Sequence, residues 1–327
     1  MKKKKKFVEL DQIYTENKPS IITKIIKNFE GDANLKTLPN ISFFIMNNYS
    51  IYSIYNKENF ELIQEFQSNL NNIEIMNENA IILYNKECME IWIKDEKNKF
   101  IKNKVIELKF KITTNILINS KSNLLLYGEN DVIRVWYIKE NIPQNIITNI
   151  KIGYKTTNLF FINNENLLGL HILYENCSYI YFLKMKDFSI VKIIDITKMF
   201  GENFRFSSDY KRYFYKINEN KIICVFPNVS RNITSFVSIQ TPEFIIEQKR
   251  KKNFISDFFI YKNYILFFNW NKNIKVFDIC KSKFIEEIKT KGFCSMIHLI
   301  DNYFLGVKVK DQYYPNSKAL VMFHLNL

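Results

Sequence analysis

Glycine and alanine are scarce in this chain of 327 residues, which has seven glycines and only three alanines, at positions 33, 80 and 319. Seven glycines leave little material for a phosphate-binding loop. The P-loop, Gly-x-Gly-x-x-Gly and Gly-x-Ser-x-Gly patterns are all absent. Isoleucine, phenylalanine, tyrosine and valine are abundant instead, and this composition favours strands over helices.

Residues that commonly carry catalysis or bind metals are also few. The three histidines, His171, His298 and His324, each lie inside an apolar segment, which predicts packed strand residues rather than catalytic bases. The five cysteines are dispersed without a Cys-x-x-Cys pair, so no zinc site is readable. We therefore predict a protein that is not an enzyme and has no catalytic residues, no cofactor, no metal and no small-molecule substrate.

Long apolar runs are missing as well. Charges or amides interrupt the longest apolar stretches, and none approaches the ~20 residues of a membrane helix. No apolar signal segment follows the initial lysines, and the odd number of cysteines suggests free thiols. These features predict no membrane insertion and an intracellular location, cytoplasmic or nuclear. A hydrophobic content of 47% with 16% aromatics predicts a folded chain.

An apolar, mostly aromatic residue recurs about every 45 residues along the chain, at intervals of 37, 44, 46, 55, 40 and 46. Around each position lie an apolar segment, a polar turn, an alternating segment and a further strand-like segment. A period of this length with four strands per unit is typical of a β-propeller. The seven positions are Tyr55, Trp92, Trp136, Phe182, Val237, Phe277 and Phe323.

Three units carry this pattern best, at residues 81–92, 124–136 and 265–278. The second ends in Ile133-Arg134-Val135-Trp136 and the third in Ile274-Lys275-Val276-Phe277-Asp278. They resemble the WD40-repeat family, whose units end in isoleucine, a basic residue, valine and tryptophan-aspartate. Among these three units only Asp278 keeps the aspartate directly after the aromatic residue, and no Gly-His dipeptide occurs. The family's Asp-His network is therefore not carried over.

The spacing predicts an all-β, seven-bladed, WD40-like β-propeller over residues 20–327, preceded by a basic tail at residues 1–19. The blades are expected at residues 41–66, 73–108, 112–152, 158–196, 212–249, 255–290 and 294–326. The last unit has only three strands, and residues 21–29 resemble the outer strand predicted at residues 284–289. We predict that this N-terminal strand completes the last blade and closes the ring. Six or eight blades stay open as alternatives, because the units around Val237 and Phe323 are assigned by spacing.

The net charge of +14 comes from 47 basic residues, of which only five are arginine. Asparagine, isoleucine and lysine are all heavily used. The charge can thus reflect compositional drift with solvated faces, or an anionic partner whose footprint would be clustered.

Three clusters stand out. The tail of lysines at positions 2–6 is either an import or anion-binding signal or a disordered, solubilising end. The run at residues 249–252 is either a contact for phosphates or acidic groups or a charged loop between blades. The long connection at residues 197–211 is either an interface or a segment whose phenylalanines pack over its blade.

The resemblance implies that connections between blades and the turns between second and third strands share one face of the ring. Interleaved basic and aromatic side chains there would hold an acidic peptide or RNA. The predicted partner-binding residues are Phe204, Arg205, Lys211, Arg212, Arg231, Lys249, Arg250, Lys251, Lys252, Lys272, Tyr313 and Tyr314.

Two functions follow as expectations. The first is a non-catalytic protein–protein interaction scaffold within an intracellular eukaryotic multiprotein or ribonucleoprotein complex, with the other proteins of that complex as partners. The alternative is an RNA-associated propeller in ribosome assembly or RNA processing, which would bind RNA through its basic loops. The scaffold function is inferred mainly by analogy with other proteins of this fold.

Overall fold

The computed structural model describes residues 22–30, 33–38, 41–108, 111–174, 177–200, 213–228, 233–252, 257–261, 264–268, 273–278, 283–289, 294–300, 303–309 and 317–324. The chain divides into two compact units. The first contains residues 1–68 and 255–327, and the second contains residues 69–254.

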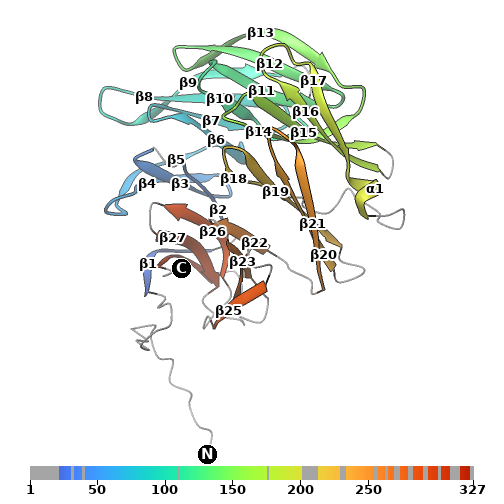
Figure 1. Ribbon diagram of the computed structural model, residues 1–327. Helices are drawn as coiled ribbons and strands as arrows, with labels where there is room; N and C mark the ends of the chain where they lie inside the picture. The colour runs from blue at the N-terminus through green and yellow to red at the C-terminus, as the bar shows by residue number, and fades with distance from the viewer. Residues whose placement is uncertain are drawn as a thin grey trace, which may run out of the picture. The chain divides into compact units, whose positions relative to one another are not determined.

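Strands dominate both units. The described residues form seven four-stranded antiparallel sheets, in which strands adjacent in sequence are hydrogen-bonded neighbours (Figure 1). The all-β prediction is therefore confirmed, and the sheets are of the kind that makes the blades of a β-propeller.

The second unit holds four sheets and the described helix. The first sheet has β6 (Asn72–Asn77), β7 (Ala80–Tyr84), β8 (Cys88–Lys94) and β9 (Phe100–Glu107). The next has β10 (Leu117–Asn119), β11 (Leu124–Glu129), β12 (Val132–Lys139) and β13 (Ile142–Lys151). The third has β14 (Lys155–Ile162), β15 (Leu167–Tyr174), β16 (Cys177–Lys184) and β17 (Ile190–Asp195), followed by α1 (Ile196–Phe200). The fourth has β18 (Tyr213–Asn218), β19 (Lys221–Asn228), β20 (Ile233–Gln240) and β21 (Ile245–Lys252).

The first unit holds three sheets. One has β2 (Ala33–Lys36), β3 (Phe43–Asn48), β4 (Ile51–Asn56) and β5 (Leu62–Gln67). Another has β22 (Asp257–Tyr261), β23 (Tyr264–Phe268), β24 (Asn273–Asp278) and β25 (Lys283–Lys289). The last has the order β26 (Cys294–Ile300), β27 (Tyr303–Val309), β28 (Ser317–His324) and β1 (Ile22–Glu30).

In the hairpin turns, asparagine occupies left-handed positions where glycine is the usual residue. Positive φ angles are tolerated best by glycine and next best by asparagine. Six asparagines in the described residues have φ between 51° and 64°. The turn between β12 and β13 consists of Glu140 and Asn141, with φ of 51° and 64°, as a tight two-residue hairpin requires.

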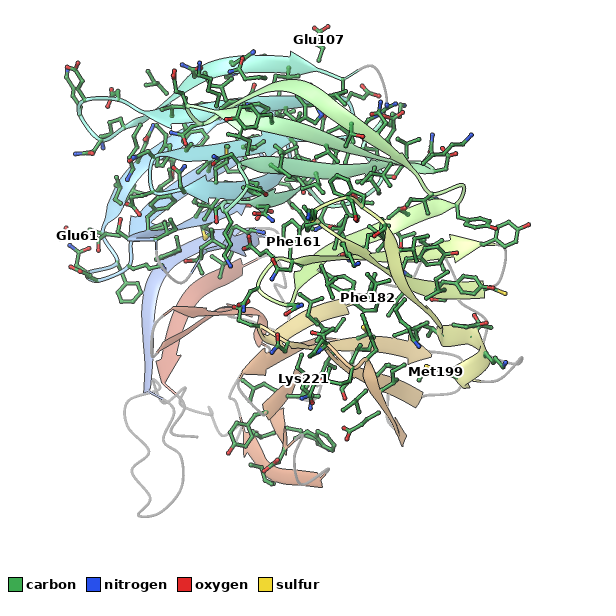
Figure 2. The ribbon with its side chains drawn as sticks, turned by 45° about the horizontal axis from the view of Figure 1, so that its top comes forward. Glu61, Glu107, Phe161, Phe182, Met199 and Lys221 are labelled. Atoms are coloured by element: carbon green, nitrogen blue, oxygen red, sulfur yellow. The ribbon has the colours of Figure 1, made fainter. Side chains whose placement is uncertain are left out.

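Each sheet in the interior of the second unit buries both of its faces. On β11, Leu125 and Tyr127 pack with residues of sheet β6–β9, whereas Leu126 packs with sheet β14–β17. A third cluster, which includes Phe182 and Val237, joins sheet β14–β17 to sheet β18–β21, and Met199 of α1 packs against it (Figure 2). This two-sided burial explains why the inner strands are apolar at nearly every position.

The recurring residue found in the sequence occupies one structural position. In every sheet it lies in the third strand, whether it is aromatic, as Tyr55 of β4 is, or aliphatic, as Val237 of β20 is. Tyr55 stacks on its cross-strand partner Phe44, with ring centroids 5.1 Å apart. The assignment of the two weak units around Val237 and Phe323 is thus confirmed at the level of the sheets.

The N-terminal strand pairs as predicted. β1 adds to β28 as the edge strand of its sheet, with Ile22 opposite His324 and Glu30 opposite Ser317. This pairing completes four strands in a sheet whose other members come from the far end of the chain.

Six of the seven sheets share an irregularity between their third and fourth strands. The register shifts between Ile54 and Tyr55, Ile91 and Trp92, Val135 and Trp136, Phe182 and Leu183, Val276 and Phe277, and, between β1 and β28, Ile25 and Lys27. In five of these sheets the shift adjoins the recurring aromatic residue. The ladder between β20 and β21, where Val237 takes that place, runs through eight residue pairs without a shift.

Three expectations need correction. The sheet at the first predicted blade has a strand that was not predicted, the four-residue β2. The connection at residues 197–211 begins with α1, capped by the Asp195 carboxylate, which accepts a hydrogen bond from the Lys198 N–H at 2.8 Å. Residues 249–252 lie in β21 and not in a loop, because the extended pairing with β20 continues through them.

Candidate functional site

The structure describes four of the twelve predicted partner-binding residues. Lys249, Arg250, Lys251 and Lys252 are consecutive residues of β21. The other eight lie outside the described residues, as does the lysine tail at positions 2–6. The predicted common face therefore stays a prediction.

The basic run forms the end of an edge strand. Phe236 to Ile233 of β20 pair with residues 249–252 of β21, one by one. Within the described residues β21 has a neighbouring strand on one side only. Its first half is anchored, because Ile246 packs against the cluster that contains Phe182. The run is thus a charged edge built on a packed strand.

A second surface, absent from the sequence-based predictions, consists of four tyrosines and an isoleucine on sheet β14–β17 and directly before β14. Tyr154 and Tyr174 are 38% and 47% exposed, and their ring centroids are 4.8 Å apart. Tyr179 and Tyr181 of β16 are half-buried, with centroids 6.5 Å apart. Ile193 pairs with Tyr181 and is 47% exposed. We call these five residues the tyrosine patch.

Two tyrosines of the patch pack on an apolar cluster and have raised pKa values. Tyr179 and Tyr181 pack against the cluster shared by sheets β10–β13 and β14–β17. The pKa of Tyr179 is raised to about 12, mainly by a hydrogen bond with Cys177 and to a smaller extent by desolvation. Desolvation and then the neighbouring Tyr154 raise the pKa of Tyr181. At neutral pH both phenols are neutral and can donate and accept hydrogen bonds, as tyrosines at interfaces do.

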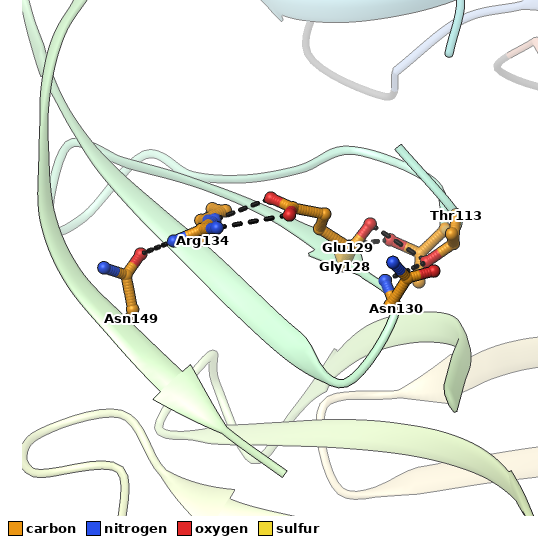
Figure 3. A network of polar contacts seen from close by, with 7 residues as sticks. Thr113, Gly128, Glu129, Asn130, Arg134 and Asn149 are labelled. Atoms are coloured by element: carbon orange, nitrogen blue, oxygen red, sulfur yellow. Dashed lines mark hydrogen bonds and ion pairs between the residues drawn. The ribbon is translucent and has the colours of Figure 1, made fainter. Parts of the chain in front are cut away.

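A buried ion pair organises sheet β10–β13. Arg134 Nε lies 2.7 Å from Glu129 Oε2, and Arg134 Nη2 lies 3.2 Å from Glu129 Oε1 (Figure 3). Arg134 Nη1 donates to Asn149 Oδ1 of β13 at 2.7 Å. The hydrogen bond to Glu129 is the main reason that the pKa of Arg134 is raised. Because its donors meet partners on β11 and β13, this arginine holds three strands together and is not an anion site.

Thr113 fastens the neighbouring turn. Its Oγ1 donates to the Gly128 carbonyl at 3.1 Å and accepts from the Asn130 N–H at 3.2 Å (Figure 3). The turn between β11 and β12 is thereby tied to the segment that precedes β10.

The one histidine whose side chain is described is a satisfied core residue, as predicted. His171 Nδ1 lies 2.5 Å from Thr157 Oγ1, and His171 Nε2 lies 2.8 Å from Ser178 Oγ. Thr197 Oγ1 accepts from the Ser178 N–H at 2.7 Å. A serine beside a histidine can act as a nucleophile. Here both His171 and Ser178 are 0% exposed, so a substrate would not reach them.

Among the described residues, no group of three or more His, Cys, Asp or Glu is placed to hold a metal ion. Across the same part of the chain, no helix has the length and apolar character needed to cross a bilayer.

The sequence indicated the basic run at residues 249–252 but not the tyrosine patch. The basic run at residues 249–252 can be recognised in the sequence, but its position on a regular edge strand follows only from the pairing of β20 with β21. Tyr174, Tyr179 and Tyr181 lie on one face because β15 and β16 alternate and pair in a particular register. An alternating Tyr-x-Tyr in a strand beside a Tyr-ending strand is the signal that would have found them.

No protein-family model matches this chain, and no match was found among curated proteins.

Proposed function

We propose that the seven sheets are the blades of a WD40-like β-propeller, closed by the pairing of β1 with β28. We propose further that the protein is a non-catalytic protein–protein interaction scaffold within an intracellular multiprotein or ribonucleoprotein complex. The repeated third-strand residue and the four-stranded meanders support the fold. The face-to-face packing of consecutive sheets in the second unit supports it too.

The tyrosine patch is the observation that carries the binding role. Tyrosine is among the residues that contribute most to binding at protein interfaces. Tyr174, Tyr179 and Tyr181 belong to paired strands, so their backbone is already ordered before a partner packs on them. Tyr154, Tyr174 and Ile193 expose more than a third of their surface, next to two half-buried tyrosines.

The basic residues favour a second candidate, an RNA-associated propeller in ribosome assembly or RNA processing. The four positive residues at the end of β21 support it, together with the net charge of +14. Phosphate contacts make such binding strongly dependent on salt, whereas an apolar protein interface is not.

Affinity capture of the tagged protein from native lysate tests both candidates. The eluates are compared at low and high salt, with and without nuclease, by mass spectrometry and RNA sequencing. A defined protein set that survives high salt and nuclease supports the scaffold. Specific RNA that is lost as salt rises supports the alternative.

A pair of variants localises the interface. Tyr154→Ser with Tyr174→Ser should remove the captured proteins, because these two rings form the exposed part of the patch. Tyr137→Ser is the matched control, since Tyr137 is 43% exposed on β12, outside the patch. Equal loss in both variants, or none in either, counts against the tyrosine patch.

A further inference from the structure

β21 differs from the other fourth strands in the regularity of its pairing. In the described residues, each of the six other ladders between a third and a fourth strand shifts register, which gives the fourth strand an extra residue. The extra residues include Asn103 of β9, Val191 of β17 and Ile285 of β25. All eight residues of β21 pair in sequence with β20.

Such irregularities protect a sheet edge. A β-bulge bends and twists its strand and interrupts the row of N–H and C=O groups that another strand would meet. Six fourth strands therefore carry this protection in the described residues. β21 does not, and its outer edge keeps the regular spacing that a further strand needs.

The charge on β21 selects what can pair there. Lys249, Arg250, Lys251 and Lys252 are consecutive, and successive residues of a strand alternate between its two faces, so each face is assigned two basic residues. A second copy of β21 would bring like charges together, which is destabilising, whereas acidic residues opposite them would be favourable. Lysine on an edge is a known defence against self-pairing, and here it also defines the complementary partner.

We infer that β21 is a docking edge at which an extended, acidic segment of a partner protein adds as a fifth strand. This inference rests on the proposed scaffold role and names the chemistry of one partner. The ladder groups of an edge strand match another polypeptide backbone, which is why a peptide fits better than RNA. Main-chain hydrogen bonds would supply affinity, and the four positive residues would supply selectivity.

Fluorescence anisotropy on the full chain tests the inference. The probe is a labelled eight-residue peptide of alternating glutamate and threonine. The control peptide has the same sequence with N-methyl groups on alternate residues, which removes N–H donors but keeps the charge. Binding of the control should be at least about tenfold weaker, because several main-chain hydrogen bonds are lost together. Equal binding of the two peptides would show plain charge attraction and overturn strand addition.

Variants then locate the edge. Lys249→Glu with Lys251→Glu should abolish binding of the unmodified peptide. Lys104→Glu with Lys192→Glu makes the same change of charge at exposed lysines on β9 and β17, both of which follow a register shift, and should leave the edge of β21 intact. Equal loss in the two variants contradicts a specific edge. The peptide comparison uses the unaltered protein, so it remains decisive if a variant folds poorly.

Two further outcomes separate the hypotheses. If a poly(U) RNA of equal charge displaces the peptide and binds more tightly, the partner class is wrong. If affinity capture yields a partner set that Lys249→Glu with Lys251→Glu leaves unchanged, while the acidic peptide does not bind, the docking edge fails and the scaffold proposal stands.

Discussion

Replacing Arg134 with methionine should destabilise the protein strongly. Glu129, whose side chain is 7% exposed, would lose the cation that meets both of its oxygens. Removing one partner of a buried ion pair costs about 3–5 kcal/mol. The Arg134 side chain is 15% exposed, so water can reach part of the pair, and we expect the lower end, about 3 kcal/mol.

Urea unfolding monitored by tryptophan fluorescence provides the measurement, since Trp136 lies in the same strand as Arg134. Arg134→Met combined with Glu129→Leu removes both charges and should recover most of the loss, because apolar residues often replace a buried pair at little cost. Lys111→Met is the control. Its ion pair with Glu87 has side chains 68% and 67% exposed, so its loss should cost no more than about 1 kcal/mol. A stability of Arg134→Met equal to that of Lys111→Met would refute the role assigned to the pair.

Three further predictions follow from other parts of the fold. Gly169→Ala should lower the melting temperature by several degrees in calorimetry, because a Cβ there would collide with the Phe160 ring; Gly153→Ala, which has open space but φ of 81°, should be affected less. Cys224 should resist iodoacetamide at pH 8 in the native protein, since complete burial raises its pKa well above the usual value and keeps the thiolate scarce. Peptide mapping should show the partly exposed Cys88 and Cys177 modified before Cys224. Deleting residues 1–30 should cause unfolding or aggregation, seen by light scattering, because β28 would lose its partner β1; a truncated chain that melts like the full one would contradict the closure.

The sequence was most informative where an apolar, mostly aromatic residue recurs at the same position of each four-stranded unit. The third-strand residues from Tyr55 to Phe323 could be aligned because each is apolar and they recur at a nearly constant spacing. Tyr55, Trp92, Phe182, Val237 and Phe277 are buried in the structure. The pairing of β1 could be inferred from its likeness to β25, and both strands carry an extra isoleucine at the register shift, Ile26 and Ile285.

The rest depended on contacts between strands. β2 was missed because Ala33-Asn34-Leu35-Lys36 is short and has no strong strand formers. The Lys-Arg-Lys-Lys run was interpreted as a possible loop because four charged residues lack the apolar alternation of a strand. Its extended backbone is stabilised by pairing with β20. The surroundings of His171 could not be read either, since Thr157 and Ser178 belong to the strands on either side of β15.

The asparagines at positive φ bear on how this backbone can diverge. A left-handed turn residue is commonly glycine, yet Asn98, Asn123, Asn130, Asn141, Asn163 and Asn164 adopt this geometry here. Asparagine tolerates the conformation at a modest strain, so a codon bias can exchange one residue for the other while the hairpin keeps its shape. Replacing these six asparagines with glycine would relieve that strain without changing the turns, so the hairpins of this fold can differ in sequence while their strand pairing is kept.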